Sequence, residues 1–238
     1  MTGRPFRVKI QQVRHLTQDI REMTLEMLEP SELAFRPGQA IAVTVPDTSQ
    51  NSPLLRYFSI ASPPHSSKQL VLLLNSQDGG KGSTFLLENE LGAELQISGP
   101  HGSFMLQHEP ERPLLFIGTG TGIAPLWSMM ATLLAKASSQ SMTLFWGLRS
   151  ESDSYYLQEL EAWKSRHENF SYVLTLSQPS SVWKGKKGRV TDLLQDLATV
   201  EDSAAYVCGN RAMVKEVTDL LKRKGAQAIY FERHSESA

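Results

Sequence analysis

Three glycines at alternate positions after an apolar run are the residues best suited to bind a ligand: Gly118, Gly120 and Gly122. Glycine permits a positive φ and lets backbone N–H groups approach a ligand closely. The helical stretch that follows begins with unpaired N–H groups and a partial positive charge, so a phosphate is stabilised there. Pro125 suits the first helical turn, where its missing N–H removes no hydrogen bond. These residues predict a phosphate or pyrophosphate site.

This glycine turn differs from both common nucleotide-binding motifs. Ile123 stands where the G-x-G-x-x-G pattern requires glycine, and no Gly-Lys-Ser/Thr follows as in a P-loop. A tight strand-to-helix turn without a ligand is therefore the alternative. Three glycines within five residues exceed what a plain turn requires, so we favour phosphate binding.

Three more stretches carry suitable chemistry: residues 56–62 (R-Y-F-S-I-A-S), residues 80–86 (G-K-G-S-T-F-L) and residues 208–210 (C-G-N). A guanidinium holds phosphate with a fixed fork of donors. An aromatic face supports a flat heterocycle, and a serine hydroxyl can donate where negative charge develops. The second stretch is another glycine-rich turn that runs into a short helix.

Composition narrows the class of protein. The 238 residues include 24 Lys and Arg against 25 Asp and Glu, a net charge of −1 that gives no general attraction to nucleic acid or anionic membranes. The single cysteine excludes a disulfide within the chain, an all-cysteine metal site and a four-cysteine iron–sulfur cluster. No apolar run approaches 18 residues and the N-terminus lacks a signal sequence. We expect a soluble cytoplasmic protein with no membrane span and no metal site.

The first half of the chain reads as short strands separated by turns. Alternating apolar and polar residues predict strands within residues 6–27, although residues 20–27 also fit a short helix. Further strands are expected at residues 40–45, 56–62, 69–75 and 94–98, with one short helix at residues 84–89. This pattern is typical of a small antiparallel barrel or sandwich.

The second half alternates strands with helices. Strands are expected at residues 114–117, 142–146, 172–176, 204–208 and 229–231, and helices at residues 126–137, 155–167, 190–197 and 212–224. Such alternation predicts a doubly wound parallel sheet, which binds ligands at the carboxyl ends of its strands. The charged, proline-bearing residues 108–113 suggest a linker, so we expect domains at residues 1–109 and 110–238.

The order and spacing of the four motifs resemble the ferredoxin–NADP reductase superfamily over roughly residues 6–234. The resemblance implies an N-terminal antiparallel six-stranded β-barrel with one short helix that binds FAD. It also implies a C-terminal α/β doubly wound parallel sheet that binds NAD(P)H. Flavin reductases and the reductase components of bacterial oxygenases belong to this superfamily.

The resemblance assigns the flavin-binding residues. In the family's R-x-Y-S strand the arginine binds flavin phosphate, the aromatic ring packs on the isoalloxazine and the hydroxyl approaches flavin N5. Arg56, Phe58 and Ser59 occupy these positions, with phenylalanine in place of tyrosine; Tyr57 also belongs to the motif, but strand alternation points it to the opposite face. The backbone N–H groups of three residues in the second glycine turn are expected to hold the pyrophosphate, which favours FAD over FMN: Gly82, Ser83 and Thr84.

The resemblance also assigns the nicotinamide dinucleotide site. The Gly118 turn matches the family's site, with the Thr119 and Thr121 hydroxyls as extra donors. Cys208 stands where the family places a cysteine near the nicotinamide ring, and Gly209 and Asn210 follow it; a small buried core residue is the equally favoured alternative for Cys208.

Two further positions follow from the same resemblance. Arg149 and Ser150 follow the second strand, where the adenosine ribose lies, and favour NADPH, while Glu151 and Asp153 nearby keep NADH open. Near the C-terminus, Glu232 fits the family's acidic residue, and His234 replaces an aromatic that can cover the flavin in relatives.

The resulting hypothesis is an FAD-dependent NAD(P)H oxidoreductase. Ser59, Cys208 and Glu232 are the expected catalytic residues. Electrons would pass from nicotinamide to flavin N5 and then to a separate acceptor: a ferredoxin, a flavodoxin, free flavin or an oxygenase component. The alternatives are an electron-transfer subunit of a larger redox complex and a non-catalytic flavin-binding regulatory protein.

Overall fold

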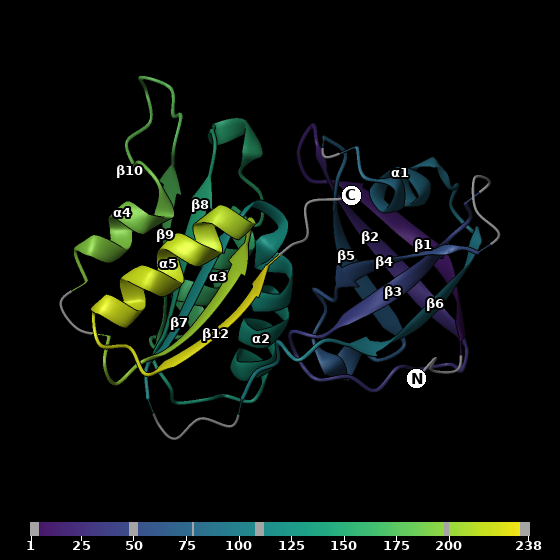
Figure 1. Cartoon of the computed structure of the whole chain (residues 1–238), viewed down its shortest axis with the longest axis horizontal. Helices are drawn as coiled ribbons and strands as arrows, with labels where there is room; N and C mark the ends of the chain where they lie inside the picture. The colour runs from purple at the N-terminus through teal and green to yellow at the C-terminus, as the bar shows by residue number, and fades with distance from the viewer. Residues whose placement is uncertain (1–4, 48–51, 78, 108–111, 198–199, 234–238) are drawn as a thin grey trace. The chain divides into compact units, whose positions relative to one another are not determined.

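The computed structural model describes residues 5–47, 52–77, 79–107, 112–197 and 200–233. The chain divides into two compact units (Figure 1). Within the described residues, the first extends to Leu106 and includes Trp127–Thr132, and the second takes Gln107–Leu126 and Leu133–Arg233. The predicted boundary between residues 109 and 110 falls among residues 108–111, which lie outside the described part of the chain.

The first unit is a six-stranded antiparallel sheet in the order β4-β3-β6-β1-β2-β5. The Ala61 N–H, just after β4, donates to the Val71 carbonyl in β5 at 2.8 Å, so the chain that follows one edge strand meets the other edge, as in the predicted barrel. The strands are β1 (Phe6–His15), β2 (Ile20–Glu29), β3 (Ala40–Val45), β4 (Leu54–Ser59), β5 (Gln69–Asn75) and β6 (Glu94–His101).

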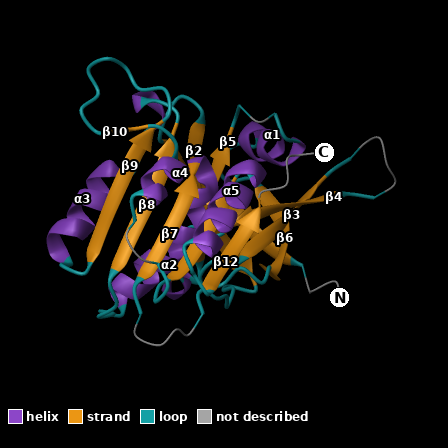
Figure 2. Cartoon of the chain, turned by 60° about the vertical axis from the view of Figure 1, so that its left-hand side comes forward, coloured by secondary structure: helices purple, strands orange, loops and turns teal. Residues whose placement is uncertain are grey.

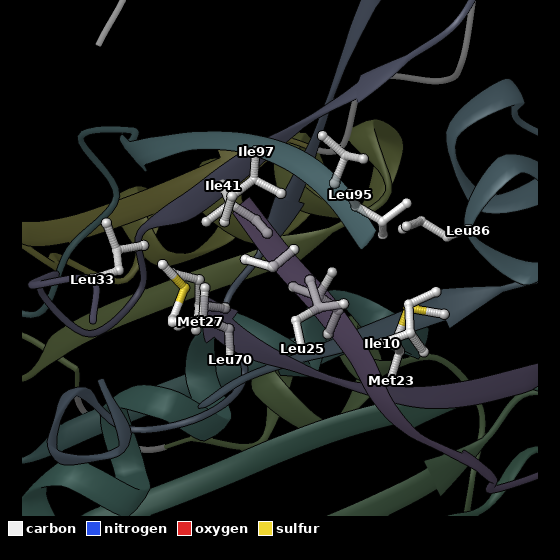
Figure 3. Packing of buried hydrophobic residues seen from close by; sticks show 14 of the residues in the cluster. Ile10, Met23, Leu25, Met27, Leu33, Ile41, Leu70, Leu86, Leu95 and Ile97 are labelled. Atoms are coloured by element: carbon white, nitrogen blue, oxygen red, sulfur yellow. The ribbon is translucent and has the colours of Figure 1, made fainter. Parts of the chain in front are cut away.

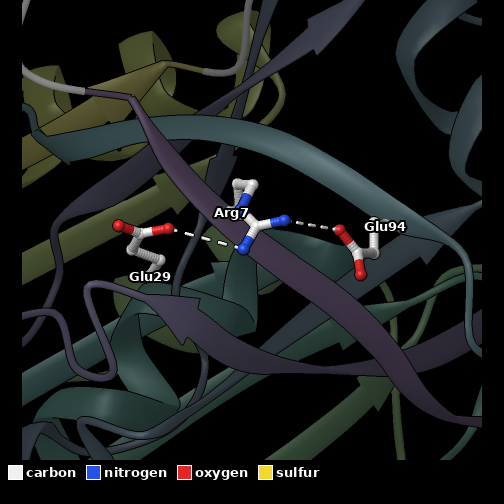
Figure 4. A network of polar contacts seen from close by, with 3 residues as sticks. All are labelled: Arg7, Glu29 and Glu94. Atoms are coloured by element: carbon white, nitrogen blue, oxygen red, sulfur yellow. Dashed lines mark hydrogen bonds and ion pairs between the residues drawn. The ribbon is translucent and has the colours of Figure 1, made fainter.

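Period-two alternation decides which side chains fill this barrel. In β2, which the sequence left open between strand and helix, Met23, Leu25 and Met27 are buried, and they join core residues from the other strands (Figure 3). Polar side chains point outward: Arg7 pairs with Glu29 and Glu94 at 3.4 and 3.1 Å (Figure 4). All three are exposed, so each pair stabilises the barrel by only about 0–1 kcal/mol.

The second unit contains the expected parallel sheet, in the order β10-β9-β8-β7-β11-β12. Five of its strands were predicted, and the two-residue edge strand β10 was not. The strands are β7 (Leu114–Thr119), β8 (Met142–Leu148), β9 (Phe170–Leu176), β10 (Lys186–Lys187), β11 (Ala204–Gly209) and β12 (Ala228–Arg233).

Helices cover both faces of this sheet (Figures 1 and 2). Residues of α4 (Val190–Gln195) and α5 (Arg211–Arg223) share a buried apolar cluster with β7, β8 and β11. The opposite face carries α3 (Leu157–Arg166), and α2 (Ile123–Ala135) follows β7, with its residues Trp127–Thr132 assigned to the first unit. Helix α2 begins three residues before its predicted start, since Pro125 is tolerated within a first turn whose N–H groups have no intrahelical partner.

This sheet fixes the place of a ligand site. The chain runs from β7 outward to β8 and β9, and then returns to the other side of β7 with β11. The order therefore reverses between β7 and β11, and open α/β sheets bind ligands at the carboxyl ends of the strands beside such a reversal. Within the described residues, no helix is both long and apolar enough to cross a membrane.

Candidate functional site

The Gly118 turn lies at the reversal point, between the end of β7 and the start of α2. Gly120 has φ +52°, a left-handed conformation that favours glycine, and an added Cβ there would meet no atom within 4 Å. Open space therefore borders the turn at Gly120. A 3₁₀ turn, Gly120–Gly122, leads into α2, where the Ile123 N–H donates back to the Gly120 carbonyl.

The turn rests on the backbone of the neighbouring β11 loop. A Cβ added to Gly122 would lie 2.5 Å from the Cys208 carbonyl oxygen and 2.8 Å from the Gly209 Cα. An added Cβ at Gly209 would in turn collide with the Thr119 hydroxyl. The structure therefore brings together two motifs, the glycine turn and Cys208–Gly209, that lie far apart in the sequence.

Two buried aromatic donors hold the turn from inside the unit. The Trp146 indole N–H and the Tyr155 hydroxyl both donate to the Gly120 carbonyl, at 3.3 and 3.1 Å. Their rings pack edge to face with centroids 4.8 Å apart, and both side chains are buried. Sequence reasoning gave neither residue a role, because no local pattern marks a buried ring as a donor to a distant carbonyl.

Cys208 and its neighbours lie at the end of β11. The Asn210 side chain caps α5 by accepting a hydrogen bond from the Met213 N–H at 2.9 Å. Cys208 is completely buried, and burial, followed by the negative charge of Glu232, raises the pKa of its thiol well above the usual value. Glu232 is its register partner on β12. The thiol is therefore protonated at neutral pH.

The expected adenosine end of the site lies beyond β8. Arg149 donates through Nε to the Gln178 side chain at 3.1 Å, and this bond does not use the two terminal NH₂ groups of its guanidinium. Asp153 accepts hydrogen bonds from the Ser150 N–H and hydroxyl at 2.8 and 2.7 Å. Glu151 accepts bonds from the Ser180 N–H and hydroxyl.

The loop after β9 adds positive charge at the same end. Hydrogen bonding from Ser180 is the largest cause that lowers the pKa of Glu151, and the charge of Lys187 adds to it. Lys186 and Lys187 pair with Thr175 and Leu176, the last residues of β9, so both lie at the carboxyl end of the sheet. Residues 177–189 contain four basic residues and no Asp or Glu: Lys184, Lys186, Lys187 and Arg189.

In the first unit, the flavin-motif residues alternate along the edge strand β4. Arg56 and Phe58 pair with the core residues Val43 and Ile41, and Phe58 packs against the barrel core. Tyr57 and Ser59 pair with Ala42 and Ala40 on the opposite face. Tyr57 is 61% exposed and meets the His101 ring edge-on at 5.4 Å.

The second glycine turn reaches Arg56 and Phe58. It continues as α1 (Lys81–Glu88), which begins three residues before the predicted start. A Cβ added to Gly82 would lie 2.7 Å from the Arg56 Cβ and 3.1 Å from the Phe58 Cζ. Gly80 caps α1 without a side-chain hydrogen bond, and the first turn holds no acidic residue. The N-terminus of α1 thus lies beside the side-chain stem of Arg56, whose Nη1 donates to the Leu55 carbonyl at 3.2 Å.

These donors fit the two expected cofactors. An arginine whose stem lies beside a helix N-terminus that has no side-chain cap suits a pyrophosphate such as that of FAD. The second unit offers a backbone turn with open space at Gly120, at the place where parallel sheets bind dinucleotides. His234, expected to stand in for the family's terminal aromatic, lies outside the described residues.

Comparisons with known proteins agree with this architecture. Residues 7–106 match the Oxidoreductase FAD-binding domain, and residues 116–219 match the Oxidoreductase NAD-binding domain. Ferredoxin–NADP reductase B of Sorangium cellulosum is 32% identical over 225 residues, covering 92% of this chain and 91% of that protein. The toluate 1,2-dioxygenase electron transfer component of Pseudomonas putida is 29% identical over 237 residues, covering 98% and 68%.

The structures agree as well. The Amycolatopsis cytochrome P450 reductase GcoB superposes with a TM-score of 0.89 at 27% identity, covering 99% of this chain and 71% of that one. The chain spans 60–68% of the length of several oxygenase components that it matches.

The fold and the two sites define an NAD(P)H-dependent flavoprotein reductase that uses FAD and a nicotinamide dinucleotide. The chain belongs to the ferredoxin–NADP reductase superfamily.

Proposed function

We propose that this chain oxidises NADPH and delivers the electrons to a separate acceptor protein. FAD, when bound, accepts a hydride from reduced nicotinamide and releases electrons singly or as a pair. The observation that carries the proposal is the close approach of Gly82 to Arg56 and Phe58, which supports a single pyrophosphate site made from two flavin motifs. We also propose residues 1–109 and 110–238 as the FAD and nucleotide domains.

The first unit would hold FAD through charge and backbone donors. Arg56 binds the pyrophosphate together with the N–H groups of Gly82, Ser83 and Thr84 at the start of α1. Phe58 supports the flavin ring, without the phenolic hydrogen bond that a tyrosine would give. The Ser59 hydroxyl donates a hydrogen bond to the reacting edge of the flavin, where negative charge develops.

The second unit would hold the nucleotide. N–H groups of the Gly118–Gly122 turn bind the pyrophosphate, with the hydroxyls of Thr119 and Thr121 beside them, and Gly209 and Asn210 form the opposite wall. Glu232, the register partner of Cys208, acts as the acidic residue at the nicotinamide end. Cys208 shapes the nicotinamide end as a protonated, buried thiol.

The preference for NADPH rests on charge at the adenosine end. A ribose 2′-phosphate binds arginine and lysine, whereas a free 2′-hydroxyl binds a carboxylate. Glu151 and Asp153 are engaged by serine donors, while Lys186 and Lys187 flank the same edge of the sheet as Arg149. The Sorangium relative is named a ferredoxin–NADP reductase, which agrees with this preference.

The acceptor is proposed to be a separate electron-transfer or oxygenase protein. The relatives are named as a ferredoxin reductase and as oxygenase electron transfer components. One cysteine in 238 residues cannot hold a four-cysteine cluster, so an iron–sulfur cluster that accepts the electrons would have to be bound by residues outside these 238.

Anaerobic titration of the FAD-loaded protein with NADH and NADPH, followed by visible absorbance, tests the reaction. Bleaching by NADPH at lower concentration than by NADH is expected. Reduction of ferricyanide, free FMN and a [2Fe–2S] ferredoxin then compares the acceptors, and faster reduction of ferredoxin than of FMN is expected. A flavin that neither nucleotide reduces would support a regulatory flavoprotein instead.

Arg149→Gln and Lys187→Gln test the nucleotide preference, with Lys215→Gln on α5 as the matched control. Each of the first two should lower kcat/KM for NADPH about tenfold, since a charge-assisted hydrogen bond contributes about 1.5–3 kcal/mol. The value for NADH should stay unchanged. An equal fall with both nucleotides would contradict a 2′-phosphate site at Arg149.

A further inference from the structure

The two buried donors on the Gly120 carbonyl suggest a role for residues outside the nucleotide turn. Trp146 and Tyr155 come from β8 and from the segment before α3, and neither belongs to a sequence motif. Both bond the same oxygen, which also accepts the Ile123 N–H. Such convergence fixes the direction in which this carbonyl points.

Peptide geometry transfers this direction to the next residue. The Gly120 carbonyl and the Thr121 N–H belong to one planar, trans peptide unit, in which they point in opposite directions. Trp146 is fully buried and Tyr155 is 4% exposed, so the carbonyl points into the interior of the unit. The Thr121 N–H therefore points outward.

The neighbouring glycine makes this support necessary. Gly120 has φ +52° with no atom within 4 Å of an added Cβ, so sterics do little to restrain the adjoining peptide. A flipped peptide would present a carbonyl oxygen to a phosphate, and like partial charges would repel. Donors on the inner side are what disfavour that flip.

We propose that Trp146 and Tyr155 are positioning residues that aim the Thr121 N–H at the nucleotide pyrophosphate by holding the Gly120 carbonyl inward. The proposal rests on the function of this chain as an NAD(P)H oxidoreductase. Burial raises the pKa of Tyr155 well above its usual value, so its hydroxyl stays a donor at every working pH. Nucleotide binding should then be independent of this group's titration.

Tyr155→Phe and Trp146→Phe each remove one donor and keep an aromatic ring in the core. Each should raise the Kd for NADP⁺, measured by calorimetry, about three- to tenfold, the range of one ordinary hydrogen bond. The double variant should raise it further, since only the Ile123 N–H then holds the carbonyl. The KM for NADPH should rise in parallel while kcat changes little.

Hydrogen exchange separates positioning from general stability. In Tyr155→Phe, deuterium uptake of the apo protein should rise in the peptide covering the Gly118 turn and stay unchanged in β9 and α5. Tyr172→Phe is the matched control, because it removes a tyrosine hydroxyl that donates to Glu161 on the surface, and its Kd and exchange should equal those of the wild type.

Two results would overturn the proposal. One is an unchanged Kd for NADP⁺ in both single variants and in the double variant. The other is a rise in exchange spread over the whole second unit, which would make the two aromatics general core residues. A wild-type chain that binds neither NADP⁺ nor NAD⁺ would instead contradict the oxidoreductase function, and this is measured before any variant.

Discussion

The two glycine turns of this chain present backbone N–H groups in similar ways, yet different atoms surround their glycines. In the first unit, Gly82 at the start of α1 lies against the side chains of Arg56 and Phe58. In the second, Gly122 lies against the main chain of Cys208 and Gly209. The Phe58 ring and the Arg56 Cγ can rotate away from an added methyl group, and the Arg56 Cβ can move with the edge strand β4, whereas β11 is fixed between two strands.

The secondary-structure elements around the two turns also differ in how firmly the rest of the unit holds them. Arg56 and Phe58 lie on β4, an edge strand of its sheet, and α1 has eight residues. The Gly118 turn follows β7, which has a strand on each side, and two interior donors hold its carbonyl. The FAD site therefore depends on individual side chains, and the nucleotide site depends on backbone packing.

Gly122→Ala should have the largest effect and tests this contrast directly. The new Cβ would lie 2.5 Å from the Cys208 carbonyl oxygen, so the β11 backbone must move. Overpacking of this kind costs about 1–3 kcal/mol, and we expect the upper end. Urea unfolding followed by tryptophan fluorescence measures it, since three of the four tryptophans lie in the second unit: Trp146, Trp163 and Trp183. Nucleotide binding should be lost.

Gly120→Ala is the matched control within the same turn. Its Cβ would enter open space, so only the left-handed conformation opposes it, at about 1–2 kcal/mol. The free energy of unfolding should therefore fall less than in Gly122→Ala. Equal losses in the two variants would mean that conformation, and not backbone contact, limits this turn.

Arg56→Ala should have the next largest effect, and on ligand binding instead of folding. A charge-assisted hydrogen bond contributes about 1.5–3 kcal/mol, so the Kd for FAD should rise about ten- to a hundredfold. The melting temperature of the apo protein should hardly change, because the Arg56 side chain donates to its neighbour, Leu55, and to no other group within the described part of the chain.

Arg7→Ala is the control for charge on the same barrel. It removes an exposed guanidinium paired with Glu29 and Glu94, away from β4, and FAD retention should stay at the wild-type level. Equal FAD content in purified Arg56→Ala and wild type would remove Arg56 from the flavin site.

Local patterns in the sequence were sufficient for most of the architecture. Alternation identified the barrel strands, because one face of each must be apolar, and the βα repeat identified the parallel sheet. The glycine turn was recognisable because three glycines in five residues have few other uses. These features depend on neighbouring residues only.

The contacts that build the two sites could not be predicted in the same way. Gly82 meets Arg56, and Gly122 meets Cys208, only after tertiary folding. The sequence assigned no role to the side chains of Trp146 and Tyr155 or to the two lysines of β10. Helix α1 starts at Lys81, before its predicted first residue, and so includes Gly82. Glycine is a poor helix former, and only the close approach of Gly82 to β4, a tertiary contact, accounts for its presence there.

Gly82→Ala should have a smaller effect than Gly122→Ala and sharpens the comparison. The added Cβ would meet Arg56 Cβ and Cγ at 2.7 and 2.9 Å. Because a Cβ moves only with its backbone, β4 must shift, and an edge strand does so more easily than β11, which has a strand on each side. Alanine also favours the helix by about 0.8–1.0 kcal/mol, which offsets part of the strain. The Kd for FAD should rise about three- to tenfold, as for one displaced hydrogen bond, with stability nearly unchanged. Unfolding as severe as in Gly122→Ala would show that the first unit is equally rigid.

Cys208→Ala should have the smallest effect, and it tests whether the backbone of residue 208 supports the Gly118 turn without the thiol side chain. Because burial raises the pKa of the thiol, little thiolate forms at mildly alkaline pH, and a maleimide or disulfide reagent should label the native protein far more slowly than the urea-unfolded chain. The unfolded chain has a thiol pKa of about 8.5, and the folded protein has a higher one. The protonated thiol therefore stabilises the folded protein below about pH 8.5, and this stabilisation is lost as the pH rises toward the folded pKa. Cys208→Ala should therefore flatten the alkaline fall in stability while keeping the contact between Gly122 and residue 208. Rapid labelling of the native thiol would place it at an open surface, and the β11 loop would then be a mobile wall of the nucleotide site instead of a fixed one.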